Sequence, residues 1–336
     1  MICCCVGDGR PVTGHPQILY IGLYAMSTIH CELTTRCNLS CPYCYVSPRL
    51  GSELNAEEWI RLLRLLGHLD EMTYVITGGE PLLRVDLIDI LSAASSAGIC
   101  HLYTNATVSE AEFLRVLEHV DMVRISLDGA SPKDYQRVRG GDYFSNVVAN
   151  IRHLVRNDIP HSVQMTVSEA NVDCMKQTVS LLESLGVERI LLSPQLKVRA
   201  SHGELLAMEE LSKRIQMVFS LSSRIVQKLA IEPSGCVSKF YPGAACGVYQ
   251  ERFLITSDGW LAGCPLLAAS SNCIQYLVGE TFEGVRSAVK NARLSVAQQS
   301  AVSACTTCTE LTKCGGWCPG VRGGVTEACP RFRPTN

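Results

Sequence analysis

The sequence has no run of 18 or more apolar residues and no surplus of positive charge. Without such a run, we expect no helix that crosses a membrane. Its 30 lysines and arginines face 32 aspartates and glutamates, so no basic surplus favours binding to nucleic acid phosphates. The first residues also lack the cationic stretch and the apolar core of a secretory signal. We therefore expect a cytoplasmic protein whose main partners are neither membranes nor nucleic acids.

What the sequence does contain is typical of a globular protein with an unusual number of thiols. Hydrophobic residues make up 47% of the 336 residues and charged residues 18%. This length predicts about two domains, or one large domain with an appendage. The chain has 18 cysteines. Because disulfide-rich secreted domains are usually short, cysteines in a chain this long favour metal binding in a reducing compartment.

Three cysteines with close spacing follow the apolar run at 30–34. Cys37, Cys41 and Cys44 have the spacing Cys-x3-Cys-x2-Cys. A [4Fe–4S] cluster normally takes four thiolates, so a loop that supplies three leaves one iron free for another ligand. Catalytic zinc sites keep an open position for the same reason. On the residues alone, a zinc site and a cysteine cluster without metal remain alternatives.

This spacing, with Tyr43 before the last cysteine, resembles the signature of the radical S-adenosylmethionine (SAM) enzymes. The resemblance implies that Cys37, Cys41 and Cys44 are the catalytic residues and hold a [4Fe–4S] cluster whose open iron chelates SAM. It implies that one electron from the cluster cleaves SAM. The 5′-deoxyadenosyl radical that forms would then abstract a hydrogen atom from the substrate.

Apolar strand patterns alternate with helical patterns from about residue 29 to residue 195. The strands are expected at 29–34, 73–76, 99–103, 122–127, 161–167 and 189–192. The helices are expected after Asn55 and at 84–97, 109–119, 144–156, 172–185 and 204–230. Ser109 and Glu112 have the spacing of a capping box. This alternation predicts an α/β fold with a parallel sheet and right-handed crossovers, and it leaves open whether the sheet closes.

The family resemblance implies a partial (β/α)6 barrel of the TIM type, with ligands at the C-terminal ends of its strands. We assign residues 1–27 to an irregular N-terminal tail and residues 28–230 to the barrel. Residues 231–336 form a cysteine-rich C-terminal extension in this assignment.

Three further segments lie where strands are expected to end. Gly78-Gly79-Glu80 follows the second strand, where glycines allow close approach to a ligand and a carboxylate can accept from an ammonium group. It resembles the family segment that holds the SAM amino group. Asn105 and Ser126 end the third and fourth strands and resemble positions that meet the SAM ribose and carboxylate. Their alternative is ordinary turn chemistry.

Tyr43 and Arg139 complete the expected cofactor-binding residues. Arg139 stands beside two glycines and is a candidate partner of the SAM carboxylate. Its alternative is a solvated charge on a loop.

A second group of cysteines occupies the C-terminal third of the chain. Its pattern is Cys246, Gly259-x4-Cys264, Cys305-x2-Cys308-x5-Cys314-x3-Cys318 and Cys329. The pattern resembles the seven-cysteine SPASM extension of radical SAM enzymes, which binds two auxiliary [4Fe–4S] clusters. The resemblance implies that one cluster takes Cys305, Cys308, Cys314 and Cys329, and the other Cys246, Cys264 and Cys318. Cys236 is the candidate fourth ligand of the latter, and a pair of zinc sites is the alternative.

SPASM enzymes mostly modify peptides, so the expected substrate is a ribosomally made peptide that is cross-linked or epimerised. The alternatives are oxidation or decarboxylation of a small molecule such as a tetrapyrrole, and sulfatase maturation. Pro265 counts against the last, because a carboxylate usually follows that cysteine. A reductant such as flavodoxin or ferredoxin is expected. The segment at 1–27 is too short for a peptide-binding domain, so we expect either a separate leader-binding protein or a substrate that needs none. A non-catalytic iron–sulfur redox carrier is the alternative from another class.

Overall fold

A computed structural model of the chain describes residues 27–46, 49, 51–69, 72–195, 229–231, 252–263, 273 and 275–299. Most of the helix expected at 204–230 lies outside these residues. The expected end of that helix is wrong, because Leu229 begins a strand. No helix within the described residues is both long and apolar enough to cross a membrane.

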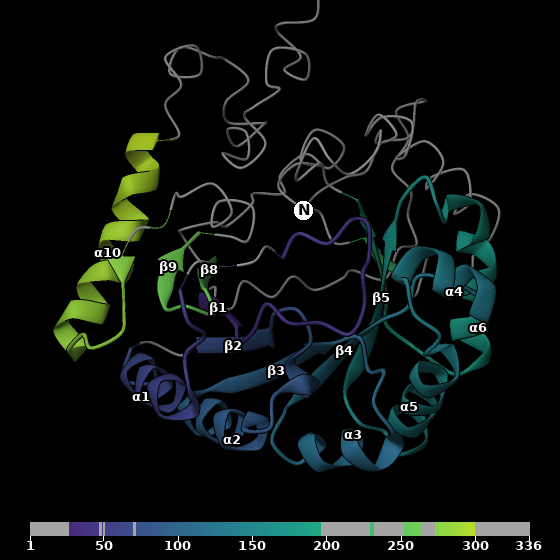
Figure 1. Cartoon of the computed structure of the whole chain (residues 1–336), viewed down its shortest axis with the longest axis horizontal. Helices are drawn as coiled ribbons and strands as arrows, with labels where there is room; N and C mark the ends of the chain where they lie inside the picture. The colour runs from purple at the N-terminus through teal and green to yellow at the C-terminus, as the bar shows by residue number, and fades with distance from the viewer. Residues whose placement is uncertain are drawn as a thin grey trace, which may run out of the picture.

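One curved sheet organises the described residues (Figure 1). Its strands are β1 (Ser27–Glu32), β2 (Met72–Thr77), β3 (Ile99–Thr104), β4 (Met122–Ser126), β5 (His161–Val167), β6 (Ile190–Pro194), β7 (Leu229–Ile231), β8 (Arg252–Ile255), β9 (Trp260–Ala262) and β10 (Gln275–Tyr276). Their order is β10-β9-β8-β1-β2-β3-β4-β5-β6-β7. All neighbours from β8 to β7 pair in parallel, while β9 pairs antiparallel with β8 and β10.

Helices cover the outer face of this sheet (Figure 1). They are α1 (Ala56–Leu66), α2 (Leu87–Ala97), α3 (Glu110–Leu117), α4 (Pro132–Arg139), α5 (Phe144–Arg156), α6 (Met175–Ser184) and α10 (Phe282–Gln299), with short 3-10 turns η1 (Pro81–Leu83) and η2 (Val172–Cys174). The six predicted strands and the α/β fold of partial-barrel type are confirmed. Strands β8 to β10 come from the segment assigned to the extension, and β8 pairs with β1 in the same sheet.

Local signals explain where several helices begin and end. Asn55 opens α1 with a capping box, and the predicted capping box of Ser109 opens α3. Helix α4 was missed because its sequence is mostly polar. Its ends carry the signals that identify it: Ser131 caps the helix ahead of Pro132, and Gly140 ends it at φ +78°.

The core lies between the sheet and the helices. Alternate residues of β1 and the apolar face of α1 meet there, with Ile29, Cys31, Trp59 and Leu63 all fully buried. Burying each such side chain contributes about 1.5–3 kcal/mol. Cys31 and Cys100, which belong to neither cysteine group, are fully buried core residues.

On the face of the sheet away from the helices, β1, β3 and β4 carry polar side chains. The guanidinium carbon of Arg124 on β4 lies 4.3 Å from the ring centroid of Tyr103 on β3. The Tyr103 ring in turn meets His30 of β1 edge to face, with centroids 6.1 Å apart. Loss of hydration, together with Arg252 and Arg124, lowers the pKa of His30 to about 4.

This shift predicts a pH-dependent stability. Because the pKa of His30 falls from 6.5 to about 4 on folding, the unfolded chain binds more protons between these values. Stability is therefore lost as the pH falls from 7 to 4, by up to about 3 kcal/mol from this side chain. Urea titrations of the iron-free chain will show a flatter pH profile in His30→Gln. Equal flattening in His119→Gln, in the turn after α3, would contradict the assignment.

Candidate active site at the strand ends

The loop after β1 carries the three predicted cluster cysteines. Cys37 and Cys44 are exposed, Cys41 is half buried, and all three are free thiols. The amide of Cys44 donates to the carbonyl of Cys41 at 3.1 Å, which closes a turn between these two. The thiols therefore share one short loop at the C-terminal end of β1.

The loop after β2 is fastened to this cysteine loop through the backbone. Gly79 N–H donates to the Thr34 carbonyl at 2.7 Å, and Glu80 N–H donates to the Arg36 carbonyl at 2.8 Å. A Cβ atom at Gly79 would overlap with the Arg36 carbonyl, and one at Gly78 with that of Thr34. Gly78 also has φ +143°, which disfavours other residues. In the structure these glycines make room for the cysteine loop, and their expected contact with a ligand stays a prediction.

Glu80 joins the ends of β2 and β3. Its fully buried carboxylate accepts from Thr104 Oγ1 at 2.7 Å, from Asn105 N–H at 2.7 Å and from Leu82 N–H at 3.0 Å. Burial raises the pKa of Glu80, and these donors oppose the shift. In this conformation the carboxylate holds the loop after β3 in place.

Asn105 reaches the cysteine loop from β3. Its amide nitrogen lies 3.0 Å from Asn38 Oδ1 and 3.8 Å from Cys37 Sγ, while its oxygen accepts from Thr107 N–H at 3.1 Å. Ser126, the last residue of β4, is half buried at the same ends of the strands. The structure therefore places Asn105 against the cluster cysteines.

A buried carboxylate that the sequence reasoning missed organises the other side of the loop. Asp128 Oδ2 accepts from Tyr43 Oη and forms an ion pair with Arg139 Nε, while its Oδ1 accepts from Thr166 N–H at 2.6 Å. Burial raises the pKa of Tyr43, so its phenol stays protonated and can donate. In the sequence Asp128 stands before Gly129, a pair typical of ordinary turns, so no local signal marks its role.

Arg139 is not a solvated loop charge, because it ends helix α4 and is buried. Its Nη1 lies 3.6 Å from Cys41 Sγ, and its carbonyl accepts from Ser40 N–H at 3.2 Å. We expected Arg139 to pair with the SAM carboxylate, whereas here it pairs with Asp128. Breaking a buried ion pair costs about 3–5 kcal/mol, so Asp128 holds Arg139 firmly in its place beside Cys41.

The three free thiols on one short loop fit a four-iron cube, because each thiolate of such a cluster binds a different iron. Although both residues are exposed overall, partial loss of hydration around the sulfur atoms raises the pKa of the Cys37 and Cys44 thiols, so binding iron as thiolates requires them to lose protons.

The predicted auxiliary ligands lie outside the described residues. They are Cys236, Cys246, Cys264, Cys305, Cys308, Cys314, Cys318 and Cys329. Their role as cluster ligands stays a prediction.

Comparison with solved structures shows the same fold. SuiB of Streptococcus suis, bound to the precursor peptide SuiA, superposes with a TM-score of 0.71 over 88% of this chain and 72% of that chain. The enzyme anSMEcpe with bound AdoMet superposes with a TM-score of 0.69 over 88% of this chain and 89% of that chain. Both are 15% identical in sequence, so these likenesses concern the fold alone.

Sequence comparison extends this likeness. The probable GTP 3′,8-cyclase of Methanopyrus kandleri is 31% identical over 70% of this chain and 80% of its own length. The AdoMet-dependent heme synthase of Methanosarcina barkeri is 30% identical over 46% of each chain. The PqqA peptide cyclase of Ruegeria pomeroyi is 32% identical over 47% of this chain. The matched region spans less than half of the last two relatives.

The model of the Radical SAM superfamily matches residues 31–182, which include the cysteine loop and the strand ends described above. Membership of this superfamily implies a [4Fe–4S] cluster and SAM as cofactors, and the three free thiols fit such a cluster. Taken with the relative that matches over most of its length, these findings show that the chain is an enzyme of the radical SAM superfamily.

Proposed function

We propose that this enzyme cleaves SAM reductively and thereby starts hydrogen abstraction from a peptide. The observation that carries the proposal is the loop of three free thiols, hydrogen-bonded to the Gly78-Gly79-Glu80 loop at the strand ends. When bound, the [4Fe–4S] cluster supplies the electron for the cleavage. Cys37, Cys41 and Cys44 hold three of its irons and leave the fourth for SAM.

The surrounding residues position and tune this site. Asn105 and Arg139 each place a donor near a thiol sulfur, and hydrogen bonds to the sulfurs shift the potential of a cluster. Asp128 and Tyr43 hold Arg139 and the cysteine loop together. We assign Ser126 at the end of β4 and the backbone at 78–80 after β2 to the orientation of SAM.

The named relatives, the similar fold of SuiB and the C-terminal cysteine pattern all favour a peptide as the substrate. Some relatives bear the name PqqA peptide cyclase, and the similar fold of SuiB was determined with its precursor peptide bound. The C-terminal cysteines also match the SPASM pattern, which accompanies peptide modification. On this proposal the enzyme cross-links or epimerises a ribosomally made peptide. It takes electrons from a flavodoxin or ferredoxin, and a separate leader-binding protein is a further candidate partner.

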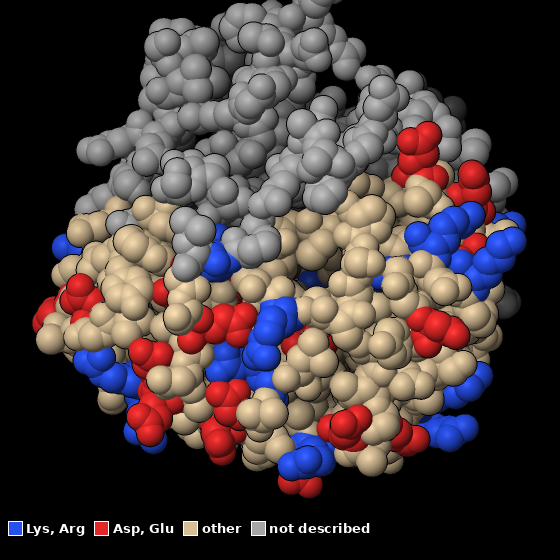
Figure 2. Space-filling view, viewed as in Figure 1, with Lys and Arg blue, Asp and Glu red and all other residues tan. Residues whose placement is uncertain are grey.

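A small-molecule substrate is the second candidate. It is favoured by the relatives named as a GTP 3′,8-cyclase and a heme synthase, the first of which matches over most of its length. Such a substrate would need neither a leader-binding protein nor a precursor gene. On the face seen in Figure 2, acidic and basic side chains are interspersed and form no large patch of one sign.

Two auxiliary clusters complete the proposal. Cys236, Cys246, Cys264 and Cys318 would hold the first, and Cys305, Cys308, Cys314 and Cys329 the second. The β8–β9 hairpin supports this arrangement. Strand β8 pairs with β1, and β9 ends at Ala262, two residues before Cys264. The chain thus enters this cysteine region from beside the strand that carries the cluster loop.

The first prediction concerns iron and SAM cleavage. After anaerobic reconstitution, the chain will bind about twelve irons, as three four-iron clusters require, and will form 5′-deoxyadenosine from SAM with dithionite. Cys37→Ala will abolish the cleavage, because the cluster loses a ligand. Cys174→Ala, a half-buried cysteine at the start of α6, is the matched control and will retain it. Zinc in place of iron, or full iron loading without cleavage, would disprove the proposal.

The second prediction separates the substrate classes. Incubation with SAM, reductant and a precursor peptide encoded beside the gene will change the peptide. Mass spectrometry will show the loss of two hydrogen atoms per cross-link, or uptake of deuterium from heavy water on epimerisation. Conversion of GTP or a tetrapyrrole under the same conditions, with the peptide unchanged, would move the small-molecule candidate ahead.

The third prediction tests the approach of the two loops. Gly79→Ala will destabilise the chain by about 1–3 kcal/mol, because its methyl group forces the Arg36 backbone away. Iron loading at the cysteine loop will fall with it. In Gly284→Ala the methyl group meets only the flexible side chain of Glu280, so this helical control will load iron normally. Normal iron loading and stability in Gly79→Ala would show that the loops need not approach so closely.

A further inference from the structure

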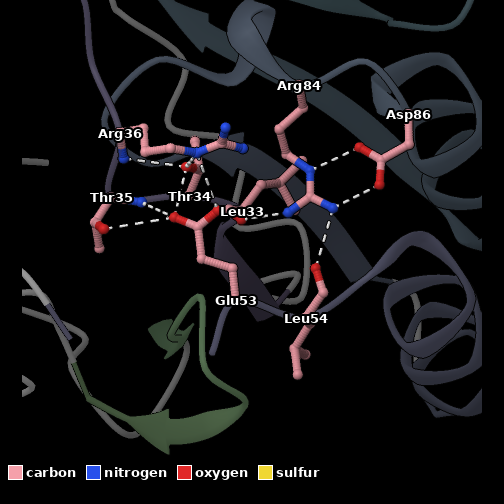
Figure 3. A network of polar contacts seen from close by, with 8 residues as sticks. All are labelled: Leu33, Thr34, Thr35, Arg36, Glu53, Leu54, Arg84 and Asp86. Atoms are coloured by element: carbon pink, nitrogen blue, oxygen red, sulfur yellow. Dashed lines mark hydrogen bonds and ion pairs between the residues drawn. The ribbon is translucent and has the colours of Figure 1, made fainter. Parts of the chain in front are cut away.

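Four charged side chains gather at residues 33–36, the segment that leads from β1 into the cysteine loop (Figure 3). They are Arg36, Glu53, Arg84 and Asp86, and we call them the brace. Glu53 comes from the residues just before α1, while Arg84 and Asp86 follow the Gly78-Gly79-Glu80 loop. The brace therefore connects three parts of the chain that meet at the end of β1.

Glu53 holds the residues immediately before Cys37. Its Oε1 accepts from Thr34 Oγ1 at 2.7 Å and from Thr35 N–H at 2.8 Å (Figure 3). Its Oε2 lies 3.4 Å from Arg36 Nε. One carboxylate thus contacts three consecutive residues, and the next residue is the first cluster cysteine.

Arg84 holds the same segment from the other side. Its Nη1 donates to the Leu33 carbonyl at 2.8 Å, and its Nη2 donates to the Leu54 carbonyl at 3.0 Å. Asp86 fixes the guanidinium through contacts of 2.8 and 2.7 Å to Nε and Nη2. Such two-point pairing sets the orientation of a guanidinium group. Arg84 is therefore locked in the position where it joins the cysteine loop to the segment before α1.

Of the three predicted cluster cysteines, the brace acts on Cys37. A backbone hydrogen bond joins Cys44 to Cys41, and Arg139 further holds Cys41. Cys37 precedes that turn. Its Sγ lies near Asn105, and its backbone continues directly from residues 34–36, which Glu53 contacts. A shift of residues 34–36 would therefore move Cys37 relative to the other two cysteines.

We propose that Glu53 and Arg84 are positioning residues that set Cys37 relative to Cys41, Cys44 and the Gly78-Gly79-Glu80 loop. The proposal rests on the proposed cleavage of SAM at this site. Both residues act through the cysteine loop and not by contact with SAM. Displacement of a reacting group by about 1 Å can cost a hundredfold in rate, so a small relaxation of this segment has a measurable effect.

Glu53 is the better residue to replace, because its surroundings tolerate the change. An open pocket of about 260 Å³ borders Arg36, Glu53 and Arg84, and the Glu53 side chain is 24% exposed. Water can therefore enter when the side chain is shortened. Arg84 is buried and donates to two carbonyl groups, so its replacement risks the fold itself.

The test compares Glu53→Ala, Glu53→Gln and the control Glu58→Ala in the reconstituted enzyme. Glutamine keeps an oxygen that can accept from Thr34 and Thr35. Glu58 belongs to the capping box of α1 and lies outside the brace, so its loss weakens the same helix start without touching the cysteine loop. Measurements are the SAM KM, the kcat for 5′-deoxyadenosine, the thermal midpoint, and the EPR signal of the reduced cluster with and without SAM.

We expect Glu53→Ala to lower kcat/KM for SAM by about tenfold to a hundredfold and to weaken the change that SAM causes in the EPR signal. Glu53→Gln will keep kcat/KM for SAM and the EPR change within about threefold of the wild type. Glu58→Ala will match the wild type in both, even if its thermal midpoint falls as far as that of Glu53→Ala. Wild-type cleavage and EPR response in Glu53→Ala would overturn the proposal. So would an equal loss in Glu58→Ala.

Failure of the proposed function gives a different result. If the wild-type enzyme cleaves no SAM, that function is wrong, and hydrogen exchange then decides whether the brace exists. Faster exchange of the amides at 35–37 in Glu53→Ala, but not in Glu58→Ala, would retain the brace as the support of Cys37. Unchanged exchange in both variants would overturn it.

Discussion

Backbone hydrogen bonds between residues 33–36 and 77–80 extend the β1–β2 pairing beyond the ends of both strands, and the site depends on this extension. Only glycine leaves space for it at positions 78 and 79, because a Cβ there would overlap with the opposing carbonyl groups. The cysteine loop and the loop assigned to SAM therefore form one rigid unit. Cluster ligands and cofactor contacts come from separate strands, yet a single backbone register fixes their relative positions.

Buried carboxylates extend this unit to the other strands. Glu80 connects β2 to the loop after β3, and Asp128 connects the loop after β4 to Tyr43, Arg139 and Thr166. Buried charges are costly unless they are paired and hydrogen-bonded, and both oxygens of each carboxylate have partners here. An apolar contact could stabilise the fold equally well, but it would not specify which loop atoms meet. These carboxylates therefore contribute more to the geometry of the site than to stability.

The sequence predicted the parts of this arrangement that depend on local patterns. Six strands, the capping box at Ser109 and the cysteine spacing each lie within a short window. Helix α4 was missed because only Tyr135 and Val138 are apolar among its eight residues, so its hydrophobic period is weak. The bond between Tyr43 and Asp128 joins residues far apart in sequence, and no single-sequence pattern encodes it. The ion pair between Arg139 and Asp128 is likewise set by tertiary structure.

The sheet order gives the brace a further consequence. Because β8 lies beside β1, the turn between β8 and β9 reaches the segment before α1, where Leu54 N–H donates to the Ser257 carbonyl at 2.7 Å. The Leu54 carbonyl accepts from Arg84, which also holds Leu33. Residues 53–54 are thus attached to the cysteine loop on one side and to the β8–β9 hairpin on the other. The β8–β9 hairpin is therefore connected to the cysteine loop in two ways, by the direct pairing of β8 with β1 and through residues 53–54.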